Sequence, residues 1–208
     1  MSRRRLYQDL AAVRALVADG RARLRESTGD LDQFWLNSAR ARLASADQFL
    51  IAAAGGLNGW ARTAIGAAAM LIGATLTAVV TKALAFPAFW VIACSWVVAV
   101  LVELPVRKRT ARLAPALGRR RLERAATPVT PSRPRDLTGL PDALVTARVR
   151  LVSTALRQAG SKHWRPSYLA RAAADDPVMF WLAEADLVLC QAIDHLEQYL
   201  AADTKEPM

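Results

Sequence analysis

The hydrophobic positions of this chain follow two patterns, one in its middle and one in its flanks. Residues 63–102 are forty positions with a single charge, Lys82, which separates two uncharged apolar runs. Each run has the roughly 20 residues that a helix needs to cross the ~30 Å hydrocarbon core of a bilayer. We therefore predict a transmembrane helical hairpin over residues 60–104, with spans at 63–81 and 84–103. The alternative is a chain without a membrane anchor in which one helical hairpin is deeply buried.

In the flanks, apolar residues recur every three or four positions, which is the spacing of one helix face. We expect an all-α fold with a helix pair in residues 1–59 and further helices in residues 141–208. A basic juxtamembrane segment and a proline-rich linker, residues 105–140, lie between the hairpin and the last helices. The seams need partner helices, so they predict a bundle or a coiled coil, formed within one chain or between copies. Their leucines are Leu36, Leu43, Leu50, Leu182, Leu189 and Leu196.

Turn and capping residues mark the expected helix ends. The first helix covers residues 3–26, and the second ends near Gly55–Gly56 after a start capped by Asp30. A third helix begins near Pro141 and stops near Gly160. The last helix is capped by Asp175 or Asp176, with Pro177 at its first position.

Two of the seams are similar to each other. Phe34-Trp35-Leu36 begins one seam and Phe180-Trp181-Leu182 begins the other, with an offset of 146 throughout. The similarity indicates either a duplicated helix pair on each side of the hairpin or a chance convergence of common Leu/Ala heptads.

Charge predicts the topology. Residues 103–136 carry ten basic and three acidic side chains, and the basic ones begin directly after the second apolar run, at Arg107, Lys108, Arg109 and Arg112. Positive charge beside a membrane span stays in the cytoplasm, so both termini should be cytoplasmic, in a bacterial inner membrane. We expect these residues to set the topology and to contact anionic lipids. No nucleic-acid partner is expected, because no aromatic residues interleave with the arginines for stacking on bases.

The two predicted spans differ in side-chain size. The first has small residues on one face at Gly66, Ala69, Gly73 and Thr77, whereas the second is bulky. Small residues let another helix approach closely in lipid, either the second span or another copy of the chain.

Motifs for catalysis, cofactors and metals are missing from the sequence. There is no nucleophile elbow, phosphate loop, carboxylate pair or metal-ligand spacing. The two histidines, His163 in a loop and His195 beside Asp194 on the last helix, are expected to be surface residues rather than catalysts, because neither belongs to a constellation of acid, base or metal ligands. Cys94 lies in an apolar run and Cys190 in the last helix, so a disulfide is not expected. We predict that the chain is not an enzyme.

These patterns predict a membrane-anchored scaffold that recruits protein partners or forms a homo-oligomer. In outline, with helices on either side of two spans, the chain resembles the SLATT-type two-transmembrane effectors that accompany bacterial nucleotide-signalling defence systems. The resemblance is one of architecture and carries no residues over. It implies, as an alternative, an oligomeric effector that disrupts membranes or forms channels. An accessory membrane protein of a conjugative or phage-derived element is a further possibility.

Overall fold

The structure is a computed structural model that describes residues 3–26, 33–56, 59–83, 97, 113–126, 137–160, 165, 171–174 and 176–203. Every regular element within these ranges is a helix, which confirms the expected all-α class. The helices are α1 (Arg3–Glu26), α2 (Gln33–Gly55), α3 (Gly59–Ala83), α5 (Leu140–Ala159) and α7 (Pro177–Asp203). Residues 113–125 and 171–174 are also helical.

The chain divides into two compact units. The first unit comprises Met1–Gly56 together with Leu117–Met208, and the second comprises Leu57–Ala116. The N-terminal and C-terminal flanks, which the apolar block separates in the sequence, therefore fold together as one body.

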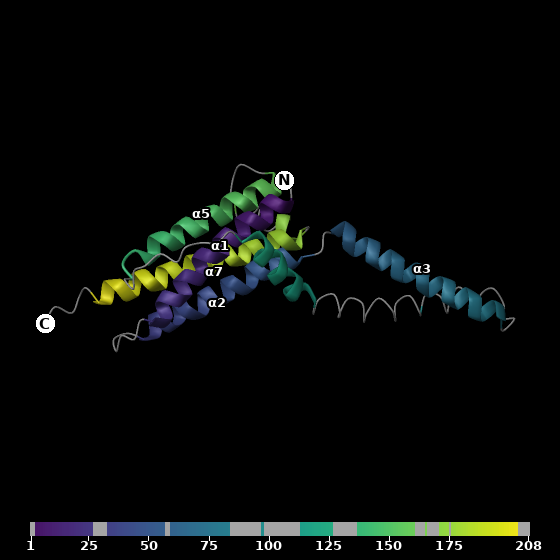
Figure 1. The fold of residues 1–208 in the computed structure, drawn as a ribbon, viewed down its shortest axis with the longest axis horizontal. Coiled ribbons are helices and arrows are strands. Elements are labelled where there is room, and N and C mark those ends of the chain that lie inside the picture. The colour runs from purple at the N-terminus through teal and green to yellow at the C-terminus, as the bar shows by residue number, and fades with distance from the viewer. Residues whose placement is uncertain are drawn as a thin grey trace. The chain divides into compact units, whose positions relative to one another are not determined.

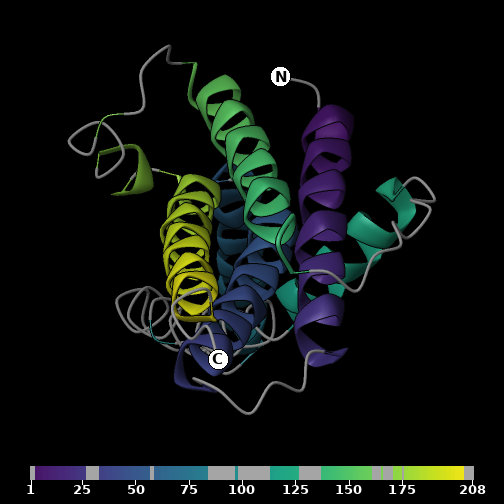
Figure 2. The ribbon, with the colours of Figure 1, turned by 90° about the vertical axis from the view of Figure 1, so that its left-hand side faces the viewer.

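In the first unit, α1, α2, α5 and α7 form a bundle. Each of these helices packs against two others, α1 against α2 and α5, and α7 against α2 and α5. Neighbouring helices run in opposite directions, as Figures 1 and 2 show. The most extensive contact joins α2 and α7, and these are the two helices whose seams alternate leucine and alanine.

The predicted seams form the core of this bundle. Gly20 takes the place of an apolar residue in the α1 seam. A Cβ added there would lie 3.2 Å from Leu140 Cδ1 of α5 and 3.5 Å from Leu43 Cδ1 of α2, so the neighbouring helices leave room only for a small residue. Apolar burial of this kind is the main stabilising contribution to a helical bundle. The six leucines named from the sequence, Leu36, Leu43, Leu50, Leu182, Leu189 and Leu196, are all 0–2% exposed.

The helix ends agree with the capping residues where the structure describes them. The backbone N–H of Val178 donates to Asp176 Oδ1 at 2.9 Å, so Asp176 caps α7. Gly160 ends α5 with φ 67°, and its N–H donates to the carbonyl of Leu156. This left-handed conformation favours glycine because it has no Cβ. Asp30 and Asp175 lie outside the described residues.

The contact between α2 and α7 repeats the 146-residue offset of the sequence. The ring centroids of Trp35 and His195 are 5.2 Å apart. Trp181 lies 146 positions after Trp35, and Phe49 lies 146 positions before His195. The ring centroids of Trp181 and Phe49 are 5.6 Å apart. The two pairs are therefore related by an approximate twofold axis, as expected when two antiparallel helices share one pattern.

The second unit contains α3, which covers the first predicted span, 63–81, in one unbroken helix. Its large apolar side chains Leu71, Leu76 and Val79 are 60–69% exposed. Among the described residues, no helix is both long enough and apolar enough to qualify as a membrane span. The second predicted span, 84–103, lies outside the described residues apart from Val97. The membrane hairpin thus stays a prediction.

The core placement of the seam predicts the effect of two nearby substitutions on α7. Leu189 is fully buried and Leu187 is 52% exposed. We expect Leu189→Ala to lower the free energy of unfolding by about 2–5 kcal/mol, because it removes buried methyl groups and leaves a cavity. The control Leu187→Ala should change it by less than about 0.5 kcal/mol. Chemical denaturation of the full chain, followed by circular dichroism, measures both. Equal losses would contradict the bundle arrangement.

Candidate functional site

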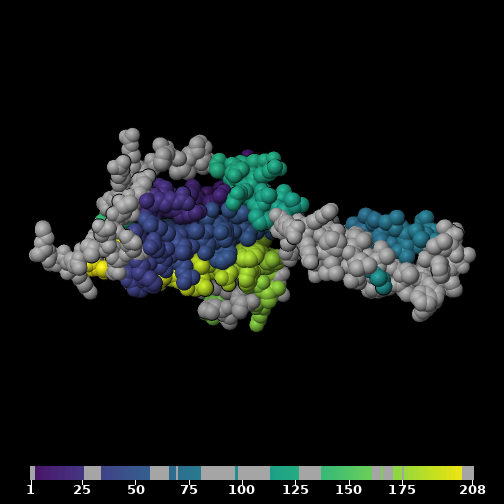
Figure 3. Space-filling view, turned by 90° about the horizontal axis from the view of Figure 1, so that it is seen from below, coloured from purple at the N-terminus to yellow at the C-terminus, as the bar shows by residue number. Residues whose placement is uncertain are grey.

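The helical segment 113–125 docks on the bundle through its residues from Leu117 onward, beside the last turn of α2. Figure 3 shows it lying over α1 and α2. A Cβ added to Gly118 would overlap the carbonyl oxygen of Ile51 and lie 2.9 Å from the amide nitrogen of Gly55. Both atoms belong to backbone that cannot move aside without disturbing α2, so this approach requires glycine. Leu122, one turn further along, is 1% exposed and completes the contact.

Arg121 ties the same segment to two helices of the bundle. Its Nη1 donates to the carbonyl oxygen of Ala54 at 2.8 Å, and its guanidinium lies 5.5 Å from the centroid of the Tyr7 ring. Ala54 is in the last turn of α2, where carbonyl groups have no partner within the helix and the helix dipole favours a positive charge. The ring of Tyr7 adds a cation–π contact. Arg121 is therefore a positioning residue that binds the segment to the bundle.

The remaining arginines of the segment point away from these contacts. Arg119, Arg120 and Arg124 are exposed, as are the apolar side chains of Leu113 and Leu117. The role of Arg121 could not be predicted from the sequence, because it is one of three consecutive arginines and nothing local distinguishes it from the other two. The close contact at Gly118 could have been predicted, because a single glycine inside a basic helical stretch indicates a position where a side chain does not fit.

The other basic residues predicted for lipid and topology lie outside the described residues. These are Arg107, Lys108, Arg109 and Arg112. Their role remains a prediction.

The small-residue face of the first predicted span is described in part. Gly73 and Thr77 of α3 are buried, and the Thr77 hydroxyl donates to the carbonyl of Gly73 at 2.7 Å. No described atom outside the local backbone lies within 4 Å of a Cβ added at Gly66. The side chain of Ala69 lies outside the described part of the chain. Burial is thus observed at Gly73 and Thr77, and the role of this face in helix packing stays a prediction.

The seam leucines are covered by other helices of their own chain. Leu43 and Leu189 are fully buried within the bundle, as are the others of the set. A partner cannot reach these side chains while the bundle is folded. Of the two alternatives, pairing within one chain and pairing between copies, the first accounts for the observed burial.

Charged pairs with largely buried carboxylates join neighbouring helices of the bundle. Arg14 and Arg21 of α1 both contact Asp47 of α2, at 2.6 and 3.2 Å. Arg148 of α5 contacts Asp186 of α7 at 2.7 Å. Hydrogen bonding to Asp186 raises the pKa of Arg148 above its ordinary value, despite partial burial. Because the pKa of Arg148 in the folded chain lies above its ordinary value, the contribution of this arginine's protonation to stability is complete at every pH below that ordinary value. It therefore does not change across the physiological pH range.

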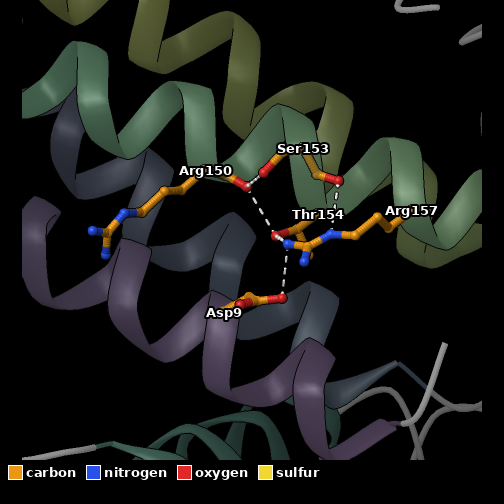
Figure 4. A network of polar contacts seen from close by, with 5 residues as sticks. All are labelled: Asp9, Arg150, Ser153, Thr154 and Arg157. Atoms are coloured by element: carbon orange, nitrogen blue, oxygen red, sulfur yellow. Dashed lines mark hydrogen bonds and ion pairs between the residues drawn. The ribbon is translucent and has the colours of Figure 1, made fainter. Parts of the chain in front are cut away.

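A third pair joins α1 to α5 and is part of a small polar network. Arg157 Nη2 contacts Asp9 Oδ2 at 3.0 Å and donates to the hydroxyl of Thr154 at 3.2 Å, as Figure 4 shows. The hydroxyls of Ser153 and Thr154 donate to the carbonyl of Arg150, both at 2.8 Å. The network is built from neighbouring turns of α5, and Asp9 is its contribution from α1. Its ion pair between Arg157 and Asp9 is a partly exposed link between helices, and such pairs contribute little to stability.

Metal-ligand side chains do not cluster in the described part of the chain. No group of three or more His, Cys, Asp or Glu side chains there could hold a metal ion. His195 lies against Trp35, and its Nδ1 makes no hydrogen bond to a described residue. Cys190 is a free cysteine. His163 and Cys94 lie outside the described residues.

The close approach at Gly118 predicts a local effect of an added methyl group. We expect Gly118→Ala to release the segment from α2, because the methyl carbon would overlap backbone atoms of Ile51 and Gly55. Amide hydrogen exchange of residues 117–125 should speed up, while exchange in the centre of α2 should not. The control is Leu117→Ala, one residue away on the exposed side, which should leave both unchanged. Unaltered protection in Gly118→Ala would contradict the docking.

Comparison of the chain with protein-family models, with curated proteins and with solved structures finds no match.

Proposed function

We propose that this chain is a membrane-anchored helical scaffold. Residues 60–104 form the anchor in the bacterial inner membrane, with spans at 63–81 and 84–103 and both termini in the cytoplasm. The bundle of α1, α2, α5 and α7 is the cytoplasmic part, which recruits protein partners or assembles with other copies.

The observation that carries this proposal is where the chain leaves and re-enters the bundle. It leaves after Gly56, at the end of α2, and it returns at Leu117. The next residue, Gly118, lies against backbone atoms of Ile51 and Gly55 in the last turn of α2. A pair of antiparallel membrane spans requires its two ends on one side of the bilayer and close together. Adjacent exit and return points meet that requirement.

The surface of α3 supports an apolar environment for the inserted segment. Leu71, Ile72, Leu76, Val79 and Val80 are each more than half exposed. Contiguous exposed apolar surface is unfavourable in water and marks a region that contacts protein or lipid. Lipid is the environment that the composition of residues 63–81 favours, because that run has no charged residue.

The burial of the Leu/Ala seams limits where a partner of the scaffold can bind. Because the seams are used inside the chain, partner contacts are confined to the outer surface of the bundle. Exposed apolar side chains lie there at Val145 and Val149 on α5, four residues apart, and at Phe180 and Leu187 on α7, seven residues apart. Both spacings place the two residues on one helix face.

The anchor and its topology are testable together. After expression in bacteria, we expect the full chain to stay in the membrane pellet during alkaline carbonate extraction. Reporter fusions at residues 1 and 208 should give cytoplasmic signals, and a fusion at residue 84 should give a periplasmic signal. A matched control deletes residues 60–104 and joins the flanks, and it should be released by carbonate. Release of the full chain, or a periplasmic signal at either terminus, would overturn the proposal.

The alternative function is a channel-forming or membrane-disrupting effector. Such a channel requires polar side chains along one stripe of its helices. In α3, the Thr75 hydroxyl donates to the carbonyl of Leu71 at 2.9 Å and the Thr77 hydroxyl to that of Gly73 at 2.7 Å. A hydroxyl that bonds to its own helix in this way has committed its only proton, so it offers a pore no hydrogen-bond donor. This observation favours the scaffold.

A membrane-potential dye distinguishes the two functions. We expect induced expression at a modest level to leave the potential unchanged, because the scaffold offers no ion path. The control is an unrelated two-span protein expressed at the same level. Rapid depolarisation that is specific to this chain would favour the effector instead.

A further inference from the structure

We propose that the exposed face of segment 113–125 binds the headgroups of anionic lipids and holds this end of the bundle on the membrane surface. The inference rests on the membrane anchor proposed above. It goes further by assigning a lipid contact to residues outside the anchor, in a segment whose other side is fixed to the bundle.

The two sides of the segment have different surroundings. Gly118 and Leu122 are buried against the bundle. Leu113, Leu117 and Arg124 are exposed. Positions 113, 117 and 124 recur at helical spacing and so share one face, opposite the face that contains 118 and 122. Docking through one face therefore leaves the other free for a second surface.

The free face has the chemistry of an interfacial helix. Its first half carries the apolar side chains of Leu113 and Leu117, and its second half carries the exposed Arg120 and Arg124, with the exposed Arg119 at its edge. A helix lying in the plane of a bilayer buries apolar side chains among the acyl chains and pairs basic ones with phosphate groups. Arginine suits this position, since its stem can lie along apolar surface while its charge stays at the headgroups. Glu123, also exposed, is the one acidic residue of the segment.

Arg121 shows why the remaining arginines are available. Its guanidinium is occupied by the carbonyl of Ala54 and the ring of Tyr7. It holds the helix in a fixed rotation, and this rotation directs Arg120 and Arg124 away from the bundle. The docking contact thus presents the basic side chains rather than neutralising them.

The exposed leucines favour lipid over nucleic acid. A nucleic-acid site would use the arginines but would leave Leu113 and Leu117 in water, 58% and 40% exposed. The free face also has no aromatic side chain for stacking on bases. Both halves of the face are satisfied at once by an anionic bilayer surface.

The test places an environment-sensitive dye on the segment in the full chain. Ala116→Cys is labelled in a Cys94→Ser, Cys190→Ser background, which keeps both leucines and all arginines. The protein is reconstituted into vesicles of neutral phosphatidylcholine, with or without phosphatidylglycerol. We expect a blue shift of the dye emission in the anionic vesicles, reduced at high salt because the attraction is electrostatic.

Matched variants separate a specific contact from net charge. Replacing Arg119, Arg120 and Arg124 together by glutamine should abolish the blue shift. Replacing three exposed arginines elsewhere in the bundle, Arg4, Arg25 and Arg150, removes the same charge and should preserve it. Circular dichroism verifies that both variants fold.

The outcomes also separate this inference from the proposed anchor. A dye signal that is the same in neutral and anionic vesicles, in protein that resists carbonate, would overturn the inference and leave the anchor intact. Carbonate release of the chain with a lipid-dependent signal would overturn the anchor and leave the inference standing. A different result would overturn the choice of ligand: the unchanged chain binds a DNA oligonucleotide, the glutamine variant of Arg119, Arg120 and Arg124 does not, and the dye shows no lipid-dependent signal. The ligand of this face would then be nucleic acid.

Discussion

The packing of α2 against α7 is the interaction on which the rest of this structure depends. Alternating leucine and alanine let the two helices approach closely along their whole length, and Trp35 and Trp181 occupy equivalent places at opposite ends of the contact. Because the two helices belong to opposite ends of the chain, their pairing brings the flanks together. The apolar block between them must then leave the bundle and return to it.

The docked segment 113–125 fixes where the chain re-enters the bundle, beside the last turn of α2. Gly118 permits backbone contact with α2, and Arg121 bonds a carbonyl of the last turn of that helix. One short helix thus combines a fixed side with a free basic side. In the function that we propose, the same end of the bundle holds the anchor and contacts the headgroups, so the helical scaffold would have a set orientation above the bilayer.

Much of the first unit could be predicted from sequence because its signals are local. Residues 3–26 show an uninterrupted helical spacing, and α1 covers that range. Asp176 and Gly160 mark helix ends through contacts within a few residues of themselves. The role of Arg121 could not be predicted in this way, since its partners Tyr7 and Ala54 are more than sixty positions away in the chain.

The sequence by itself determined the helical class, the helix boundaries and which face of each flanking helix is apolar, because these follow from periodicity and capping between near neighbours. Only the tertiary structure decided that the seams meet within one chain, that α2 lies against α7, and which arginine of a run of three is bound to the bundle. These depend on the relative placement of distant helices. A seam of Leu43 and Leu50 is equally apolar whether its partner belongs to its own chain or to another copy.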